Sequence, residues 1–158
     1  MDSAILYLPI TSNDTLDKCR SLEMEKRTIF IASYPKSGTT WMQWIIYRLL
    51  SPDDHEIQDG FHISQFSPFF EIDPHWEENG SFSKLFSEKH QTLGTRLFNT
   101  HLTWSNMPKS YGNNITKYVY VVRRGKDVCT SFYHHLVNQA DNGGFEGTFE
   151  QFFDDWSS

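Results

Sequence analysis

The sequence has little of what builds a metal centre or a disulfide-stabilised fold. It contains two cysteines among 158 residues, and Cys19 and Cys129 lie too far apart for a C-x-x-C motif. No cluster of aspartate and glutamate residues predicts a metal ion either. We therefore expect no bound metal and no disulfide framework. Both cysteines are expected to be buried free thiols, as in a reducing compartment.

Long apolar runs and an excess of positive charge are also missing. The best candidate for a membrane span, residues 41–50, is interrupted by Gln43 and Arg48. The N-terminus has Asp2 where a signal peptide would be basic, and Pro9 interrupts its apolar run. The formal net charge of −6 disfavours general nucleic-acid binding, so an anion site would have to be a local basic pocket. We expect a cytoplasmic protein that binds neither a membrane nor a nucleic acid.

The chain does contain enough apolar residues for one domain with a core. Hydrophobic residues make up 38% of it and aromatic residues 16%, which indicates a globular fold rather than disorder. We expect residues 1–158 to form a single domain, with residues 1–27 as an irregular lead-in. Residues 55–95 hold many aromatic side chains without a clean period. They are expected to be loop-rich, either folding over an apolar cavity or forming a satellite of the core.

Strand and helix patterns alternate along the rest of the chain. β-branched and aromatic runs predict strands over residues 28–32, 96–101 and 117–122. Apolar and amphipathic patterns predict helices over residues 41–50, 127–138 and 149–156. This alternation predicts an α/β fold with a largely parallel sheet.

Ligands of such sheets bind beyond the carboxyl ends of the strands, so the residues that close the strands are candidates for a site. Tyr34, His101 and Arg123 each close a predicted strand. If the strands are parallel, all three residues reach the same edge of the sheet.

The segment after the first predicted strand, Ser33–Trp41, suits a bound phosphate. Gly38 lets the backbone pass close to a bulky anion, and Lys36 adds a positive charge. The start of the following helix offers backbone N–H groups without intrahelical partners and a favourable macrodipole. Further donors are the hydroxyl groups of Ser37, Thr39 and Thr40.

The residue order in this turn is not that of a Walker A loop, in which lysine follows the last glycine. It closely resembles the 5′-phosphosulfate loop of cytosolic sulfotransferases, in the run Tyr34-Pro35-Lys36-Ser37-Gly38-Thr39-Thr40-Trp41. Those enzymes use 3′-phosphoadenosine 5′-phosphosulfate (PAPS) as sulfuryl donor. The resemblance implies PAPS as co-substrate, held by Lys36, Ser37, Gly38, Thr39, Thr40 and Trp41. The alternative is a strand–helix turn whose polar residues merely cap the helix.

A second resemblance to the same family begins at Arg123, after the third predicted strand. The run from Arg123 to His134 is similar to the family's 3′-phosphate segment, commonly Arg-Asn-x-Lys-Asp-x-x-x-Ser-Tyr-Tyr-His. It implies that Arg123 and Ser131 hold the 3′-phosphate, and a guanidinium fork suits phosphate oxygens. Arg124 stands where the family usually has asparagine. Without the family match, this basic run would be interpreted as the solvent-exposed end of a strand.

His101 matches the histidine of the family's Lys-Thr-His-Leu-Pro segment, where that residue is the general base. An unperturbed pKa near ~6.5 suits removal of a proton from an acceptor hydroxyl. Asn99 replaces the family's lysine and Thr103 its proline. Because the lost charge weakens stabilisation of the transferring group, we expect slow turnover. Lys36 is the second expected catalytic residue, while the other histidines are interpreted as structural.

The acceptor pocket is implied by the segment Pro68-Phe69-Phe70-Glu71, which is similar to the family's Pro-Phe-x-Glu. The resemblance places Phe69, Phe70, His101 and Phe132 in this pocket. An aromatic lining suits a small apolar acceptor such as a phenol, a steroid or an alcohol, or an amine.

The resemblance therefore implies a P-loop-like sulfotransferase fold, truncated after the 3′-phosphate-binding helix. Family members continue well beyond Ser158, so we expect a partial domain. The expected activity is sulfuryl transfer from PAPS to a small-molecule acceptor. Two alternatives stay open, a catalytically silent relative that binds a nucleotide or a partner, and a nucleotide kinase or NTPase. A homodimer also stays open, although the usual dimerisation motif does not occur.

Overall fold

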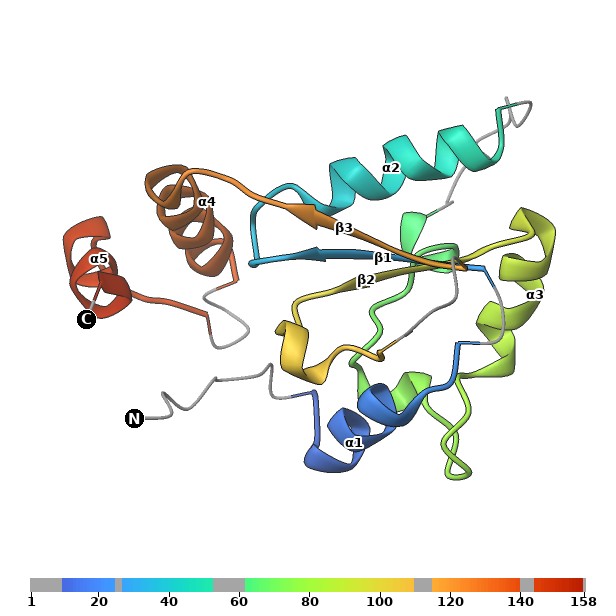
Figure 1. Ribbon diagram of the computed structural model, residues 1–158. Coiled ribbons are helices and arrows are strands. Elements are labelled where there is room, and N and C mark those ends of the chain that lie inside the picture. The colour runs from blue at the N-terminus through green and yellow to red at the C-terminus, as the bar shows by residue number, and fades with distance from the viewer. Residues whose placement is uncertain (1–9, 25–26, 53–61, 110–114, 140–143, 158) are drawn as a thin grey trace.

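The computed structural model describes residues 10–24, 27–52, 62–109, 115–139 and 144–157 (Figure 1). The strands are β1 (Thr28–Ser33), β2 (Arg96–Thr100) and β3 (Thr116–Val121). The α-helices are α1 (Asn13–Ser21), α2 (Thr39–Leu50), α3 (Lys84–Leu93), α4 (Gly125–Val137) and α5 (Phe149–Ser157). Short 3₁₀ turns are η1 (Ile63–Gln65), η2 (Asp73–His75) and η3 (Trp104–Asn106).

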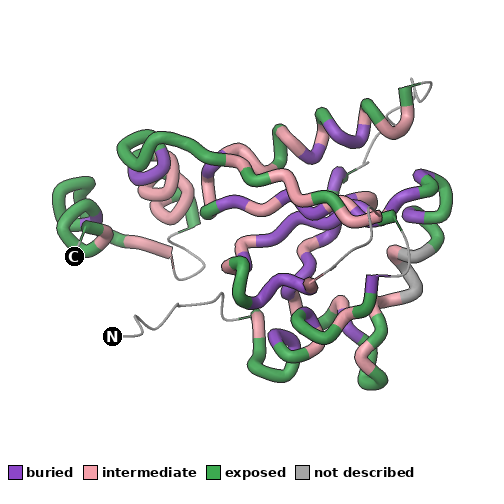
Figure 2. Tube along the Cα trace, in the orientation of Figure 1, coloured by how far each residue is buried: buried purple, intermediate pink, exposed green. Residues whose placement is uncertain are grey.

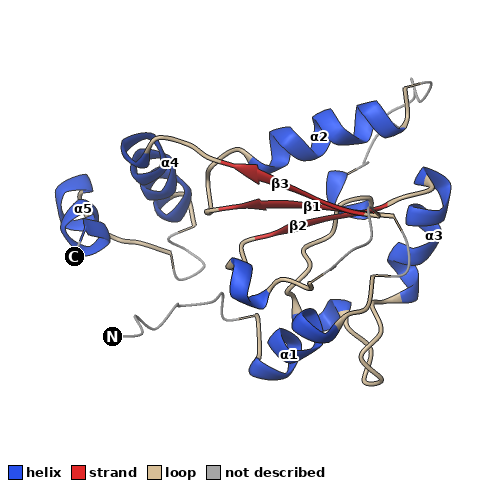
Figure 3. Cartoon of the chain, viewed as in Figure 1, coloured by secondary structure: helices blue, strands red, loops and turns tan. Residues whose placement is uncertain are grey.

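The three strands form a parallel sheet in the order β2-β1-β3, which confirms the predicted α/β fold (Figure 3). The register aligns Ala32 of β1 with Thr100 of β2, and Ser33 of β1 with Val121 of β3. All three strands therefore end at one edge of the sheet, as the sequence predicts. Helices α4 and α5 lie beyond that edge, whereas α2 runs along one face of the sheet (Figure 1).

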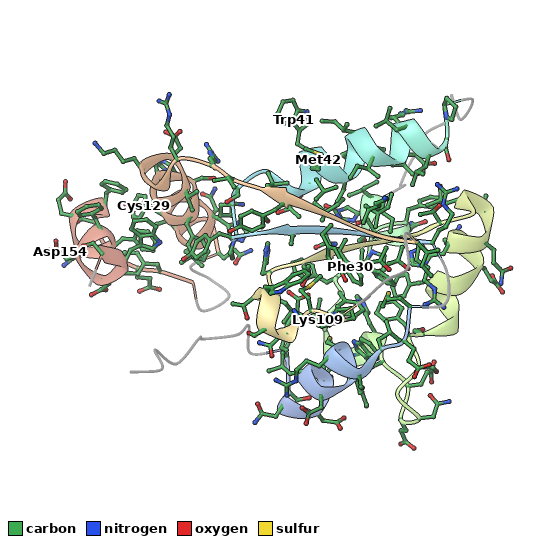
Figure 4. All side chains as sticks on the ribbon, viewed as in Figure 1. Phe30, Trp41, Met42, Lys109, Cys129 and Asp154 are labelled. Atoms are coloured by element: carbon green, nitrogen blue, oxygen red, sulfur yellow. The ribbon has the colours of Figure 1, made fainter. Side chains whose placement is uncertain are left out.

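The core on the α1 side of the sheet is built on a row of aromatic rings. Phe30 is aligned with Phe98 on β2 and with Tyr118 on β3, and its ring stacks on theirs at centroid distances of 5.4 and 5.6 Å. Leu16 and Cys19 of α1 belong to the same buried cluster. Figure 4 shows Phe30 in the interior between the sheet and this layer.

The opposite face of the sheet packs on α2 through aliphatic side chains. Because successive residues of a strand point to opposite faces, the neighbours of Phe30 on β1 face the helix. Ile31 is fully buried there with Leu97 and with Ile46 of α2. Buried positions are concentrated in β1 and β2, whereas β3 has only intermediate and exposed positions (Figure 2). No helix in the described ranges is long and apolar enough to span a bilayer.

Two helices lie in segments for which the sequence predicts none. Residues 1–27 were expected to be irregular, yet they contain α1, whose N-cap Ser12 accepts a hydrogen bond from the Thr15 amide at 3.2 Å. Helix α3 lies in the segment expected to be loop-rich. Its buried side includes a histidine, His90, so the apolar period is interrupted. Burial lowers the pKa of His90 to about 4, and its Nε2 lies 3.1 Å from the carbonyl oxygens of Phe66 and Leu97.

Both cysteines are buried free thiols, as predicted. Helix α2 ends before Ser51, as expected from Pro52.

We predict that Phe30→Ala lowers the free energy of unfolding by about 3–5 kcal/mol, because it removes the central ring of the buried row and leaves a cavity. Denaturant-induced unfolding measures the change. Phe153→Ala is the matched control, since Phe153 is 44% exposed on α5. Equal destabilisation by the two substitutions would contradict the position of this core.

Candidate functional site

An open cavity of about 640 Å³ lies at the carboxyl edge of the sheet. It brings together the residues that the sequence predicts for the site, except Tyr34, Ser37 and Phe70. The predicted residues in its lining are Lys36, Gly38, Thr39, Thr40, Trp41, Phe69, His101, Arg123, Ser131 and Phe132. The lining also contains residues that were not among the predicted site residues: Pro35, Gln43, His62, Ile63, Ser64, Asn99 and His135.

The turn between β1 and α2 is held in an unusual backbone conformation. Lys36 has φ 64°, the only positive φ of a non-glycine residue in the described ranges, and Gly38 has φ 107°. The Ser37 amide donates to the Tyr34 carbonyl at 3.2 Å, which closes the turn. The Ser37 side chain is buried and does not line the cavity, so the lining lacks this one predicted hydroxyl.

The start of α2 faces the cavity with backbone donors. Met42 donates the first intrahelical hydrogen bond, to the Gly38 carbonyl at 3.1 Å. The amides of Thr39, Thr40 and Trp41 precede that bond and have no intrahelical partner. Gly38 provides no side-chain cap for them. A strand end, a tight turn and an uncapped helix start together form an anion-binding arrangement.

Arg123, two residues after the end of β3, holds this turn by a hydrogen bond. Arg123 Nη1 donates to the Lys36 carbonyl at 2.9 Å, and the guanidinium also lines the cavity. At the end of β1, the hydroxyl oxygens of Ser33 and Thr39 are 2.5 Å apart. Partial burial lowers the pKa of His135 on α4, and the charge of Lys36 lowers it further. Among the described residues that line the cavity there is no aspartate or glutamate, so this part of the lining is basic in an acidic chain.

His101 follows β2 and is held from the adjacent strand. Its Nδ1 lies 2.7 Å from the carbonyl oxygen of Ser33. Since a carbonyl can only accept, Nδ1 carries the proton and Nε2 has a free lone pair in the neutral ring. Burial lowers the pKa of His101, and the Ser33 bond partly opposes that effect. The imidazole is therefore neutral near pH 7 and able to accept a proton.

Phe69 and Phe70 have separate roles because successive residues of extended chain point to opposite sides. Phe69 forms a parallel bridge with Asn99, and its ring lies edge-on to His101 at 5.0 Å. Phe70 was expected in the acceptor pocket, but it is fully buried in the core and its ring is 4.9 Å from that of Phe30. The prediction for Phe70 is therefore wrong.

Three further lining residues, two of them missed by sequence reasoning and one, Asn99, noted there only as a replaced lysine, share a face with predicted site residues. Gln43 stands four residues after Thr39 on α2, and His135 four after Ser131 on α4, the spacing of one helix face. Asn99 precedes His101 by two, the spacing of one strand face. These periods could have identified all three.

The amide groups of Asn99 and Gln43 meet beneath the cavity. Asn99 Nδ2 and Gln43 Nε2 both donate to the Ser67 carbonyl, at 2.6 and 2.8 Å. Their positions are therefore fixed, and neither brings a charge to the cavity. Among the residues that the structure describes, no group of three or more His, Cys, Asp or Glu side chains could hold a metal ion.

Comparisons with known proteins point to one family. A family model described as "Sulfotransferase domain" matches residues 26–157. Rabbit (Oryctolagus cuniculus) sulfotransferase 1C2 is 34% identical over 88% of this chain and 46% of its own length. Arabidopsis thaliana cytosolic sulfotransferase 5 is 32% identical over 84% of this chain and 43% of its own length. The chain thus spans less than half the length of these relatives.

A solved structure is similar in fold. It is the crystal structure of mouse sulfotransferase SULT7A1 complexed with PAP, with a TM-score of 0.62 and 25% identity. The similarity covers 92% of this chain and 46% of the mouse chain.

We predict that Gly38→Ala lowers the free energy of unfolding by about 1–2 kcal/mol, because a side chain is strained at φ 107° although no atom lies within 4 Å of the added Cβ. Gly125→Ala is the control, since Gly125 is helical and its added Cβ would only touch Trp156 at 3.7 Å. Denaturant titration of both variants measures the difference. A neutral Gly38→Ala would contradict the left-handed turn.

Proposed function

The chain belongs to the sulfotransferase family, and we propose that it transfers a sulfuryl group from PAPS to a hydroxyl or amine group of a small apolar acceptor. The proposal depends on one observation above all. A single cavity is lined both by the basic turn with Arg123 and by His101 with aromatic side chains. An anionic donor and an apolar acceptor can therefore meet in it.

The donor end of the cavity fits an anionic nucleotide. Lys36 and Arg123 supply two positive charges, and the first turn of α2 supplies backbone N–H groups. We propose that these groups bind the 5′-phosphosulfate, with hydroxyl donors from Thr39 and Thr40. Ser131 and Arg123 are assigned to the 3′-phosphate. Trp41 is 75% exposed at the start of α2 and points away from the sheet (Figure 4), which leaves its ring free to stack on an adenine.

At the acceptor end, we propose that His101 accepts the proton of the acceptor at Nε2. The bond from Nδ1 to the Ser33 carbonyl fixes the tautomer that this step requires. Phe69, whose ring is 5.0 Å from the imidazole, and Phe132 provide apolar side chains in the same cavity. Lys36 neutralises the negative charge that develops as the sulfuryl group leaves the 5′-phosphate. PAPS supplies the activated sulfuryl group, and the chain supplies position and charge.

The wider properties of the protein are proposals as well, because the chain spans less than half of its relatives. We propose that it forms part of one sulfotransferase domain and acts in the cytosol, as the name of the Arabidopsis relative states for that protein. A catalytically silent nucleotide-binding role is the second candidate. It is favoured by the uncharged Asn99, which occupies the cavity where the family's lysine would stand.

His101→Ala is expected to lower sulfuryl transfer by about 10²–10⁴-fold while binding of PAP stays unchanged, because only proton transfer is lost. Transfer of labelled sulfate from PAPS to a panel of phenols, alcohols and amines measures the first effect, and calorimetry with PAP the second. Wild-type protein that binds PAP but transfers nothing would support the silent alternative. Equal transfer by both proteins would contradict the role of His101.

Arg123→Ala should weaken PAP binding by about tenfold or more, because it removes a charge-assisted contact and the brace on Lys36. Arg124→Ala is the matched control, since its neighbouring guanidinium does not line the cavity. Thermal-shift titrations with PAP and with ATP measure both affinities. Stabilisation by ATP but not by PAP would instead indicate a nucleotide kinase or NTPase.

A further inference from the structure

A buried carboxyl group lies directly behind the proposed general base. Glu71 is only 2% exposed, and its Oε1 accepts a hydrogen bond from the backbone N–H of His101 at 2.6 Å. Its other oxygen, Oε2, is buried and without a hydrogen-bond partner in the described part of the chain. The carboxyl group does not line the cavity, so it has no direct access to a bound substrate.

The bond from Glu71 completes a two-point attachment of His101. The Glu71 carboxyl holds the backbone of the residue, while the Ser33 carbonyl holds ring atom Nδ1. Glu71 is itself fixed, because its own backbone carbonyl accepts a hydrogen bond from the Thr11 hydroxyl at 2.7 Å. The segment that carries it also pairs with β2, where the Phe70 amide donates to the Asn99 carbonyl at 2.9 Å. Movement of Glu71 would therefore move His101.

We infer that Glu71 is a positioning residue for His101, and that loss of its proton strengthens its bond to the His101 amide. A hydrogen bond to an ionised acceptor is shorter and about twice as strong as one between neutral groups. The anionic form of Glu71 therefore holds the imidazole more firmly than the neutral form does. This inference rests on the role proposed for His101.

Glu71 is one of several ionisable groups in this region, with Cys19, Arg20, Asp73, His75 and His101. Burial raises the pKa of Glu71 to about 7 from 4.5, and the bond from His101 opposes that rise. Burial, with the charge of Glu71 next, raises the pKa of Cys19 on α1, so the thiol stays neutral. Hydrogen bonds from Ser12 lower the pKa of Asp73. Burial lowers the pKa of the His101 ring itself.

The test follows the amide at position 101 by NMR as pH is varied. In wild-type protein and in His101→Ala, which keeps the backbone N–H and removes the ring, this amide proton should move downfield with a midpoint of about 7. In Glu71→Gln, whose amide oxygen still accepts but cannot ionise, that step should disappear. Glu77→Gln, at an exposed position of the same segment, is the matched control and should keep the step.

A second measurement requires no variant. The carboxyl carbon of Glu71 in wild-type protein should titrate with the same midpoint as the amide at position 101. Different midpoints, no step in wild type, or a step that persists in Glu71→Gln would each overturn the inference. These spectra do not depend on turnover, so a failure here is distinct from a failure of the proposed reaction.

Where wild-type protein transfers sulfate, kcat/KM gives a functional measure. The kcat/KM of wild type divided by that of Glu71→Gln should rise about fivefold between pH 6 and pH 8. This is the change in rate expected when a neutral hydrogen bond becomes a charged one. The ratio of wild type to Glu77→Gln should stay flat. A constant ratio for Glu71→Gln would mean that the carboxyl only fills space, and would also overturn the inference.

Discussion

The parallel register of β1 with its two neighbours determines where the whole candidate site lies. Because Ala32 is aligned with Thr100 and Ser33 with Val121, the chain leaves all three strands at one edge. The contacts that shape the site then run between adjacent strand ends, from His101 to Ser33 and from Arg123 to Lys36. If one strand shifted by one residue relative to its neighbour, each of its side chains would point to the opposite face of the sheet, and both contacts would be lost.

The same edge also explains how the turn keeps its strained conformation. A lysine with positive φ costs free energy, so it persists only where its surroundings hold it. Here Arg123 bonds to the Lys36 carbonyl, and the hydroxyl of Ser33 bonds to that of Thr39 on the far side of the turn. The donors at the helix start are thereby fixed before any anion arrives, which lowers the ordering cost of binding.

Sequence reasoning identified the features that depend on local chemistry and missed those that depend on packing. The strands, the turn around Gly38 and the strand-closing residues are encoded in short runs, and the sheet brings them together. Helix α1 was missed because few of its side chains reach the core, among them Leu16 and Cys19. The prediction for Phe70 was wrong because the bridge between Phe69 and Asn99 determines the direction in which the Phe70 side chain points. The sequence alone does not reveal that pairing.

The buried carboxyl of Glu71 links the stability of the fold to the working state of the site. Its pKa in the folded protein, about 7, lies above its ordinary 4.5, so the folded state binds the proton more tightly than the unfolded chain. The resulting stabilisation is complete below pH 4.5 and is lost as pH rises through 7, by about 3 kcal/mol in all. Burial lowers the pKa of His101, so a rise in pH leaves its imidazole neutral. The conditions that free the imidazole are therefore those in which this carboxyl weakens the fold, a trade-off typical of functional sites.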